Sequence, residues 1–329
     1  MKPISVLDLC PITEGGDAAQ SFRNTVDLAK KTEQWGYRRY WLAEHHSMPG
    51  IASSATEILI AHVASNTSSI RVGAGGIMLP NHAPLVVAEQ FGTLESLFPG
   101  RIDLGLGRAP GSDQITARAL RRTLDTNPDE FPQDVMELMN YFQPQTQGFR
   151  PVRAIPGEGL HIPIWILGSS LFGAQVAAEL GLPYAFASHF APAMLMPALE
   201  LYRERFKPSA QLDRPYVMLG FNVFAADTDE EGAFLASSVQ QSFVALRTGR
   251  PTRLKPPVRD YLSQLTPMEH SILDQALSCT AMGSPKTVRA KMDEFITRTG
   301  ADELMITSHI FDHTARVRSF ELIAEICRT

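Results

Sequence analysis

The sequence predicts a single α/β domain, residues 1–329, folded as a (β/α)8 TIM barrel, and three observations support this class. Short apolar runs of strand length alternate with helical patterns along the chain, which is typical of a parallel sheet. Eight strands, each followed by a helical pattern, can be counted. The 329 residues exceed the roughly 250 of a barrel, so about 80 remain for insertions.

The eight predicted strands are short and apolar. We expect them at residues 4–9, 40–43, 70–79, 102–106, 163–167, 184–187, 216–226 and 303–307. We expect helices at residues 21–35, 55–65, 85–97, 171–180, 193–206, 230–247, 286–299 and 315–327. Gly36 and Gly181 end two of these helices, because glycine tolerates the left-handed backbone that follows a helix.

Two long insertions are predicted, at residues 109–161 after the fourth strand and 248–284 after the seventh. Because both follow strands, both should lie over the C-terminal face, where barrels place their active sites. The basic, proline-rich stretch TGRPTRLKPPVR at 248–259 is interpreted as a mobile lid. A doubly wound sheet is the competing fold, but it usually carries GxGxxG after its first strand, where this chain reads CPITEGGDAAQ.

Composition excludes several classes of protein. The 30 basic and 35 acidic residues give a formal charge of −5, which argues against nucleic-acid binding. No run of 18 apolar residues is present, so we expect no membrane span, and the first residues lack the apolar stretch of a signal peptide. The three cysteines lie far apart, which argues against disulfides and a cysteine metal site. We therefore expect a cytoplasmic enzyme.

The second predicted strand ends in the sequence WLAEHHSMPG, with Glu44, His45 and His46 in a row. Adjacent strand residues point to opposite faces, so at most one histidine should face the barrel mouth. An acid–base role there is one interpretation, and a hydrogen-bonded structural pair is the other. A metal site is disfavoured, because neither HExxH nor CxxC accompanies the pair.

Glycines interrupt the third and fourth strands. Gly75 and Gly76 in VGAGGIMLP leave a strand without side chains, which indicates either close approach by a ligand or a tight bend. In GLGRAPG, Arg108 follows the fourth strand at once and could pair with a phosphate or with a carboxylate of the insertion. The spacing GxGxxxG is not the dinucleotide fingerprint.

Ser169 and Ser170 lie between the fifth strand and its helix. One hydroxyl could cap that helix, and the same helix N-terminus could bind a phosphate. All of these sites fall at C-terminal strand ends. A phosphate near Arg108 and the two serines, a planar group against the glycines and a nearby histidine together suggest a flavin-mononucleotide (FMN) pocket.

Four stretches carry a resemblance to a known family, namely LAEHHSMPGIAS, VGAGGIMLPNHAPLVVAEQFGTL, FPGRIDLGLGRAPGSD and ILGSSLFGAQVAAELGLPYAFASHF. They resemble the bacterial luciferase-like monooxygenase superfamily of flavin-dependent (β/α)8 barrels over essentially the whole chain. The chain is most similar to the uncharacterised luciferase-like oxidoreductases of bacteria, rather than to the light-emitting enzymes.

The resemblance implies specific flavin contacts. Arg108 falls at the arginine that binds the flavin phosphate, and Ser169 and Ser170 fall at further phosphate-binding positions. Gly75 and Gly76 match a pair that family members join by a non-prolyl cis peptide beneath the isoalloxazine ring.

His45 falls where luciferase carries its catalytic histidine. Two positions depart from luciferase. Gly107 replaces a reactive cysteine, so thiol chemistry is not implied, and Ser169 replaces a glutamate. The substrate-facing positions do not transfer, so an aldehyde substrate is not implied.

The resemblance implies an FMN-dependent monooxygenase that receives reduced FMN from a separate flavin reductase and uses O2 on a small organic substrate. No NAD(P)H fingerprint is visible, which is consistent with a separate reductase. A homodimer is also implied. Two alternatives remain: hydride transfer with the deazaflavin F420, which is less favoured, and a flavin-binding protein without catalysis.

Overall fold

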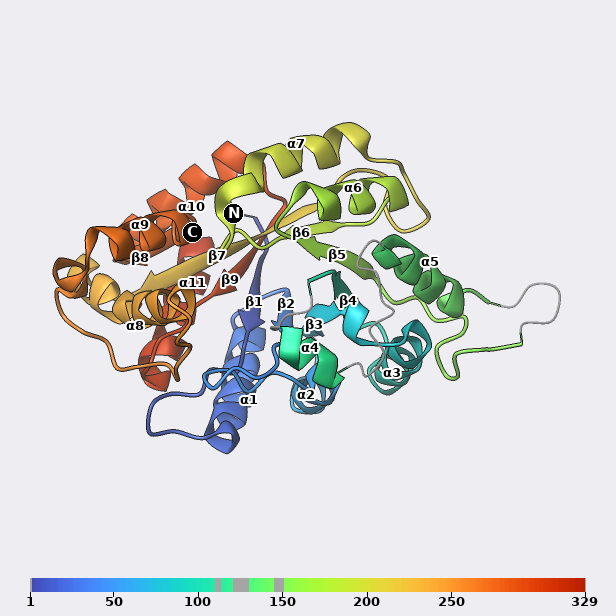
Figure 1. Cartoon of the computed structure of the whole chain (residues 1–329), viewed down its shortest axis with the longest axis horizontal. Coiled ribbons are helices and arrows are strands. Elements are labelled where there is room, and N and C mark those ends of the chain that lie inside the picture. The colour runs from blue at the N-terminus through green and yellow to red at the C-terminus, as the bar shows by residue number, and fades with distance from the viewer. Residues whose placement is uncertain (1, 110–113, 121–129, 145–150, 329) are drawn as a thin grey trace.

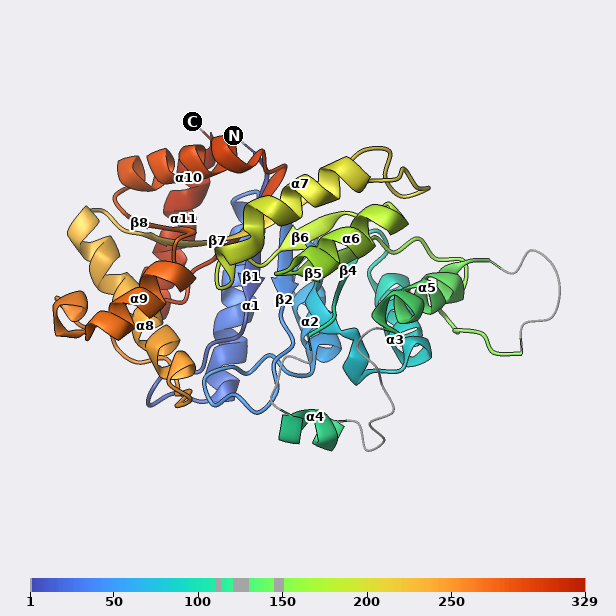
Figure 2. The ribbon, with the colours of Figure 1, turned by 45° about the horizontal axis from the view of Figure 1, so that its top comes forward.

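The computed structural model describes residues 2–109, 114–120, 130–144 and 151–328, and their strands form one sheet in which every pairing is parallel. Eight strands close into a barrel, because β6 pairs with both β5 and β7, while β9 joins β7 to β1. Helices surround the barrel, and the two chain termini lie close together (Figures 1 and 2). The predicted (β/α)8 barrel is confirmed.

Each of the eight predicted strands overlaps a strand of the barrel. These are β1 (Ile4–Asp8), β2 (Arg39–Leu42), β3 (Arg71–Met78), β4 (Ile102–Gly107), β5 (Ile164–Gly168), β6 (Tyr184–Phe186), β7 (Val217–Ala225) and β9 (Glu303–Thr307). The sequence did not predict β8 (Thr280–Gly283), a four-residue strand that pairs with the outer half of β7 and lies outside the barrel.

All predicted helices are present, with ends shifted by a few residues. They are α1 (Ala18–Gln34), α2 (Thr56–Ser65), α3 (Pro84–Leu97), α6 (Leu171–Leu180), α7 (Leu195–Arg205), α8 (Asp229–Arg247), α10 (Pro285–Thr299) and α11 (His313–Arg328). Three further helices lie within the two predicted insertions: α4 (Gln114–Leu120), α5 (Phe131–Phe142) and α9 (Pro267–Ala276). Two of the helices end at the glycines that the sequence indicates. Gly36 and Gly181 adopt positive φ angles after α1 and α6, as predicted.

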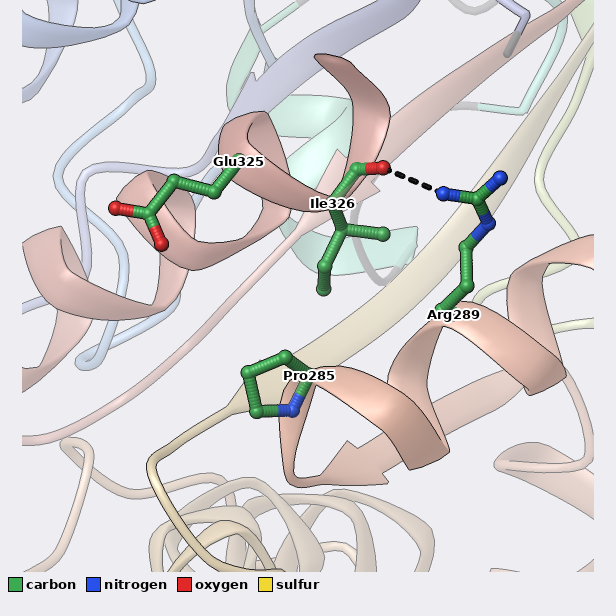
Figure 3. Close-up of a pocket in the computed structure, with 4 residues that line it drawn as sticks. All are labelled: Pro285, Arg289, Glu325 and Ile326. Carbon is green, nitrogen blue, oxygen red and sulfur yellow. Dashed lines mark hydrogen bonds between the residues drawn. The ribbon is translucent and has the colours of Figure 1, made fainter. Parts of the chain in front are cut away.

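The outer helices are tied to one another as well as to the barrel. Figure 3 shows a small surface hollow of about 270 Å³ between α10 and α11. Across it, Arg289 Nη1 donates a hydrogen bond of 2.8 Å to the Ile326 carbonyl. This hollow lies between two outer helices, so it does not include the strand ends where barrel chemistry is expected.

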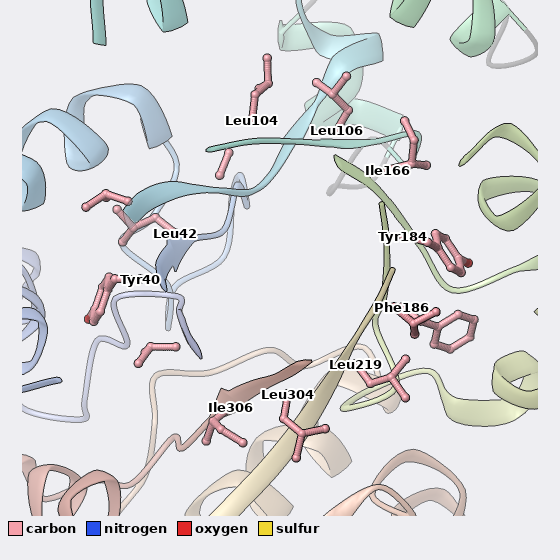
Figure 4. Packing of buried hydrophobic residues seen from close by; sticks show 14 of the residues in the cluster. Tyr40, Leu42, Leu104, Leu106, Ile166, Tyr184, Phe186, Leu219, Leu304 and Ile306 are labelled. Atoms are coloured by element: carbon pink, nitrogen blue, oxygen red, sulfur yellow. The ribbon is translucent and has the colours of Figure 1, made fainter. Parts of the chain in front are cut away.

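Residues alternate between the two faces of the barrel strands. In Figure 4, labelled side chains such as Leu104, Tyr184 and Ile306 point outward from the ring of strands, where they form the main core with the helices. Their neighbours point inward. Trp41 and Trp165 meet edge to face, with ring centroids 5.3 Å apart, and belong to a second, interior cluster. This interior layer fills the middle of the barrel.

Below that layer, the base of the barrel holds buried charges. Arg39 donates to Asp103 Oδ2 at 2.6 Å and to Glu303 Oε1 at 3.0 Å. Asp103 also pairs with Arg71 at 2.7 Å, and Glu303 accepts from the Tyr216 hydroxyl at 2.8 Å. Burial alone would lower the pKa of Arg39, but the two carboxylates hold it above its usual value. The buried charges at the base of the barrel are therefore all paired with one another.

In the part of the chain that the structure describes, no helix is both long enough and apolar enough to cross a membrane.

Candidate active site

A cavity of about 710 Å³ opens at the carboxyl end of the barrel, within the size range of ligand and cofactor sites. Inward-facing residues from all eight barrel strands, or from the positions just after them, line it. They include Leu7, Trp41, Ala43, Gly75, Met78, Gly107, Leu167, Ala185, Met218, Gly220, Asn222, Met305 and Thr307. The walls are thus mostly apolar, with a few polar groups.

The charged residues described in the cavity lining are all basic. Among the described residues that line the cavity there is no aspartate, glutamate or lysine, although the chain contains 35 acidic residues. The charged side chains in the lining are Arg108 and Arg247, accompanied by histidines. A cavity with cations and no carboxylates favours a negatively charged ligand.

Arg108 follows β4 and lies with its guanidinium carbon 4.1 Å from the ring centroid of Phe172 on α6. With the residues that the structure describes, the Arg108 side chain makes no hydrogen bond and no ion pair, so its charge is not matched there. The predicted motif GLGRAPGSD continues into residues 110–113, which lie outside the described residues. The stacking fixes the arginine beside the start of α6.

Ser169 and Ser170 both line the cavity between β5 and α6. Ser170 occupies the N-cap position, but its side chain makes no capping hydrogen bond, so the capping interpretation is wrong for this residue. Gly173, in the first turn of α6, also lines the cavity. The first N–H groups of a helix have no partner within it, so this end of α6 presents donors and the positive end of the helix dipole.

The peptide bond between Gly75 and Gly76 is cis, as the resemblance implies. Gly75 lines the cavity, whereas Gly76 lies behind it, against β4. A Cβ atom on Gly76 would lie 2.7 Å from the carbonyl oxygen of Gly105. Of the two predicted flavin contacts, only Gly75 is therefore in the cavity lining, while Gly76 lets the neighbouring strand approach.

Glu44 anchors the loops at the ends of β2 and β3. Its carboxylate is only 1% exposed and accepts hydrogen bonds from His46 Nε2 at 2.8 Å, His82 Nε2 at 3.0 Å and the Met78 N–H at 2.7 Å. Burial alone would raise its pKa, but these donors hold the pKa below its usual value. The carboxylate therefore stays ionised and fixes the backbone around the histidine pair.

His45 and His46 both line the cavity, which contradicts the expectation that only one would face the mouth. The strand alternation ends with β2 at Leu42, so it does not govern these two residues. His46 is bonded to Glu44, which confirms the structural interpretation for that residue. His45 is half-buried, and its backbone N–H donates to the Ser53 carbonyl at 2.9 Å.

Two further histidines of the lining were not identified from the sequence. His189 follows β6 and His309 follows β9. Nδ1 of His189 and Nε2 of His309 are buried without a hydrogen-bond partner within the described residues. Burial, together with the neighbouring His309 and His45, lowers the pKa of His189 to about 3. Burial and the nearby Arg316 lower the pKa of His309 to about 4.

The sequence does contain a signal for this pair, because each of the two strands is followed by Ser-His. Ser188 Oγ donates to the Gly220 carbonyl at 2.7 Å, and the Ser308 carbonyl accepts from Arg316 Nε at 3.0 Å. These bonds hold the backbone just before each histidine. Both histidines therefore have an anchored backbone, and their lowered pKa values leave the imidazoles neutral at neutral pH.

One face of α8 forms the roof of the cavity, through Val239, Ser242, Phe243, Leu246 and Arg247. The loop after α8 completes the roof with Pro251, Thr252 and Leu254.

This loop belongs to the predicted mobile lid. The structure instead ties it to the loop after β1, because the Leu254 N–H donates to the Ile12 carbonyl at 2.9 Å and the Glu14 N–H donates to the Leu254 carbonyl at 2.7 Å. In addition, Arg253 Nη1 donates to the Gly16 carbonyl at 2.9 Å. A proline-rich stretch gives no signal for such a distant pairing.

Comparison with known proteins identifies relatives along the whole chain. A family model described as luciferase-like monooxygenase matches residues 3–303. The uncharacterised protein YvbT of Bacillus subtilis (strain 168) is 57% identical over 98% of this chain and 96% of its own length. A luciferase-like monooxygenase of Escherichia coli (strain K12) is 53% identical over 98% and 96%. The N-acetyl-S-alkylcysteine monooxygenase of Bacillus subtilis (strain 168) is 31% identical over 99% and 98%.

Solved structures share the fold over nearly the whole chain. The apo form of MsnO8 superposes with a TM-score of 0.89 at 33% identity, covering 100% of this chain and 99% of that one. Two more distant structures share the fold. The oxygenating constituent of 3,6-diketocamphane monooxygenase from Pseudomonas putida, in complex with FMN, has a TM-score of 0.74 at 19% identity, covering 98% and 97%. An F420-dependent secondary alcohol dehydrogenase has a TM-score of 0.71 at 14% identity, covering 100% and 99%.

Proposed function

This chain belongs to the luciferase-like monooxygenase family, and we propose that it uses reduced FMN and O2 to oxidise a small organic molecule. The observation that carries the proposal is the cavity itself, whose described lining contains no acidic residue and in which Arg108 lies beside the N-terminal end of α6. This arrangement suits the phosphate of a flavin nucleotide, because a guanidinium and helix N–H groups are both strong phosphate donors.

The residues present fit FMN at both ends of the molecule. For the phosphate, Arg108, Ser169 and Ser170 offer donors that have no capping bond or ion pair within the described residues. For the flat ring, Gly75 offers a wall without a side chain, and Trp41 lines the same cavity. Aromatic and apolar walls with a few polar groups are what cofactor sites commonly provide.

When bound, reduced FMN supplies the electrons with which oxygen chemistry is performed. The chain contributes binding, orientation and exclusion of water, and the α8 face and the loop carrying Leu254 cover the cavity for that purpose. We assign proton transfer to the imidazole of His45. It is half-buried in the lining, whereas burial keeps its neighbours His189 and His309 neutral.

The proposal includes two partners. A separate flavin reductase would supply reduced FMN, and a second copy of this chain would complete a homodimer. Light scattering of the purified protein tests the second point directly. A monomeric mass at micromolar concentration would contradict it.

An anaerobic titration tests the proposed cofactor. The apoprotein is titrated with FMN, reduced FMN and F420, and binding is followed by flavin fluorescence and calorimetry. We expect both forms of FMN to bind, with F420 at least tenfold weaker. The reduced complex is then mixed with oxygen in a stopped-flow instrument, and we expect reoxidation that differs in rate and spectrum from that of free reduced FMN.

Each alternative gives a distinct result in this experiment. Preferential binding of F420 would favour hydride transfer with that deazaflavin. Bound FMN that reoxidises with the kinetics of free flavin would favour a binding protein without catalysis.

A further inference from the structure

The cavity contains a second cation that the flavin phosphate does not require. Arg108 stacks beside the N-terminal end of α6, whereas Arg247 lies at the C-terminal end of α8. Both arginines line the same cavity. Because no acidic residue is found among the described lining residues, neither charge is matched from within the cavity.

The position of Arg247 follows from the periodicity of α8. Val239, Ser242, Phe243, Leu246 and Arg247 are spaced as one face of a helix, and all five line the cavity. Arg247 is the last of the series and is exposed, so it lies where the cavity meets solvent. The preceding Phe243 and Leu246 form an apolar wall next to it.

Two nearby arginines contact other parts of the fold, whereas no such contact is described for the Arg247 side chain. Arg253 donates to the Gly16 carbonyl at 2.9 Å, and Arg259 lies 4.6 Å from the ring centroid of Phe234. With the residues that the structure describes, the Arg247 side chain makes neither a hydrogen bond nor an ion pair. Its charge is therefore available to a ligand that enters beneath α8.

We propose that the organic substrate is an anion with an apolar body, whose negatively charged group lies beside Arg247 at the cavity entrance. This inference rests on the proposed function, because FMN is taken to occupy Arg108 and the α6 end. The apolar body would contact Phe243, Leu246 and the walls below them. A substrate with a positive charge would be disfavoured, since no lining carboxylate is described to receive it.

A matched pair of probes tests this inference on the FMN-loaded protein. Octanoate and 1-octanol share an apolar chain and differ in charge, and their binding is measured by calorimetry at low ionic strength. An apolar cavity without a cation would favour octanol, because a carboxylate is costly to desolvate. We expect octanoate to bind about threefold to tenfold more tightly than octanol, and added salt to reduce the difference.

Two arginine variants locate the effect. Arg247→Gln should abolish the preference for octanoate. Arg250→Gln removes a nearby exposed charge outside the cavity lining and should keep it. The inference is overturned if octanol binds as tightly as octanoate, if the preference survives Arg247→Gln, or if neither probe binds. The FMN affinity of the wild-type protein and of each variant is measured in parallel, so that failure of the proposed function can be told apart from failure of this inference. A wild-type protein that binds no FMN contradicts the proposed function. Normal FMN binding without an octanoate preference contradicts only this inference.

Discussion

The two ends of the barrel use the same inward-facing strand positions in opposite ways. Along β2, the inward positions run from Arg39 at the base to Trp41, and Ala43 just beyond the strand lines the cavity at the mouth. At the base, Arg39 is paired with carboxylates on β4 and β9. At the mouth, Arg108 is paired with no described residue.

The difference separates polar groups whose partners lie within the fold from polar groups for which no partner is described. A buried charge is tolerated in a stable protein when partners satisfy it, as at the base. Unsatisfied groups in a cavity cost stability unless a ligand completes them. His189 Nδ1 and His309 Nε2 at the mouth are of this second kind.

The largest expected effect is at the base. Arg39→Met should lower the free energy of unfolding by about 3–5 kcal/mol, because it leaves Asp103 and Glu303 with one less partner in a buried site. Urea unfolding measures this loss. The matched control is Arg38→Met, whose side chain is 46% exposed and lies 3.7 Å from Glu303. It should cost no more than about 1 kcal/mol. Similar losses in both variants would contradict a specific role for the paired network.

A second prediction concerns the histidines of the mouth. The unfolded chain protonates His189 and His309 near their ordinary pKa of 6.5, whereas the folded protein resists protonation until about pH 3 and pH 4. The free energy of unfolding should therefore fall as the pH drops from about 6.5 towards 4. Each histidine contributes at most about 1.4 kcal/mol per pH unit over that range.

Chemical unfolding at a series of pH values measures this slope. His189→Gln and His309→Gln should each flatten it, whatever they do to stability at pH 8. His62→Gln, at an exposed position on α2, is the matched control for loss of a histidine. An unchanged slope in both cavity variants would show that these imidazoles are protonated as readily in the folded protein as in the unfolded chain.

The barrel itself could be predicted because its strands are separated by helices with clear periodicity. β8 and α9 could not, because a four-residue strand and a short helix inside an insertion leave little pattern. Their ends depend on local contacts, such as the reciprocal hydrogen bonds between Thr266 and Glu269 that start α9. Secondary structure within insertions is therefore the least predictable part of this fold.

The cavity lining was predictable where a residue lies within three positions of a strand end. His45 and Arg108 are of this kind. The roles of Glu44 and Arg247 depend on contacts between distant segments. Glu44 bonds a residue 34 positions away, and Arg247 reaches the cavity only because α8 covers it. No local spacing encodes such contacts, so sequence patterns alone could not reveal them.

The smallest expected effect separates helix capping from phosphate binding. Ser170→Ala should weaken FMN binding by about twofold to tenfold, the usual range for one lost hydrogen bond. It should change stability by less than about 0.5 kcal/mol, because the Ser170 side chain makes no capping bond. Thr228→Ala is the matched control, since Thr228 accepts from the Glu231 N–H at the start of α8. It should cost about 1 kcal/mol of stability and leave FMN affinity unchanged. The reverse pattern would assign Ser170 to the fold.

The most direct test of the proposed flavin site compares two ligands that differ only in the phosphate. FMN and riboflavin are titrated into the wild-type protein and into Arg108→Met. The four dissociation constants form a thermodynamic cycle, which gives the loss of affinity caused by the substitution for each ligand. If Arg108 holds the phosphate, the variant should bind FMN about 10- to 150-fold more weakly while its affinity for riboflavin changes little. Equal losses for FMN and riboflavin would place the phosphate away from Arg108 and contradict the account.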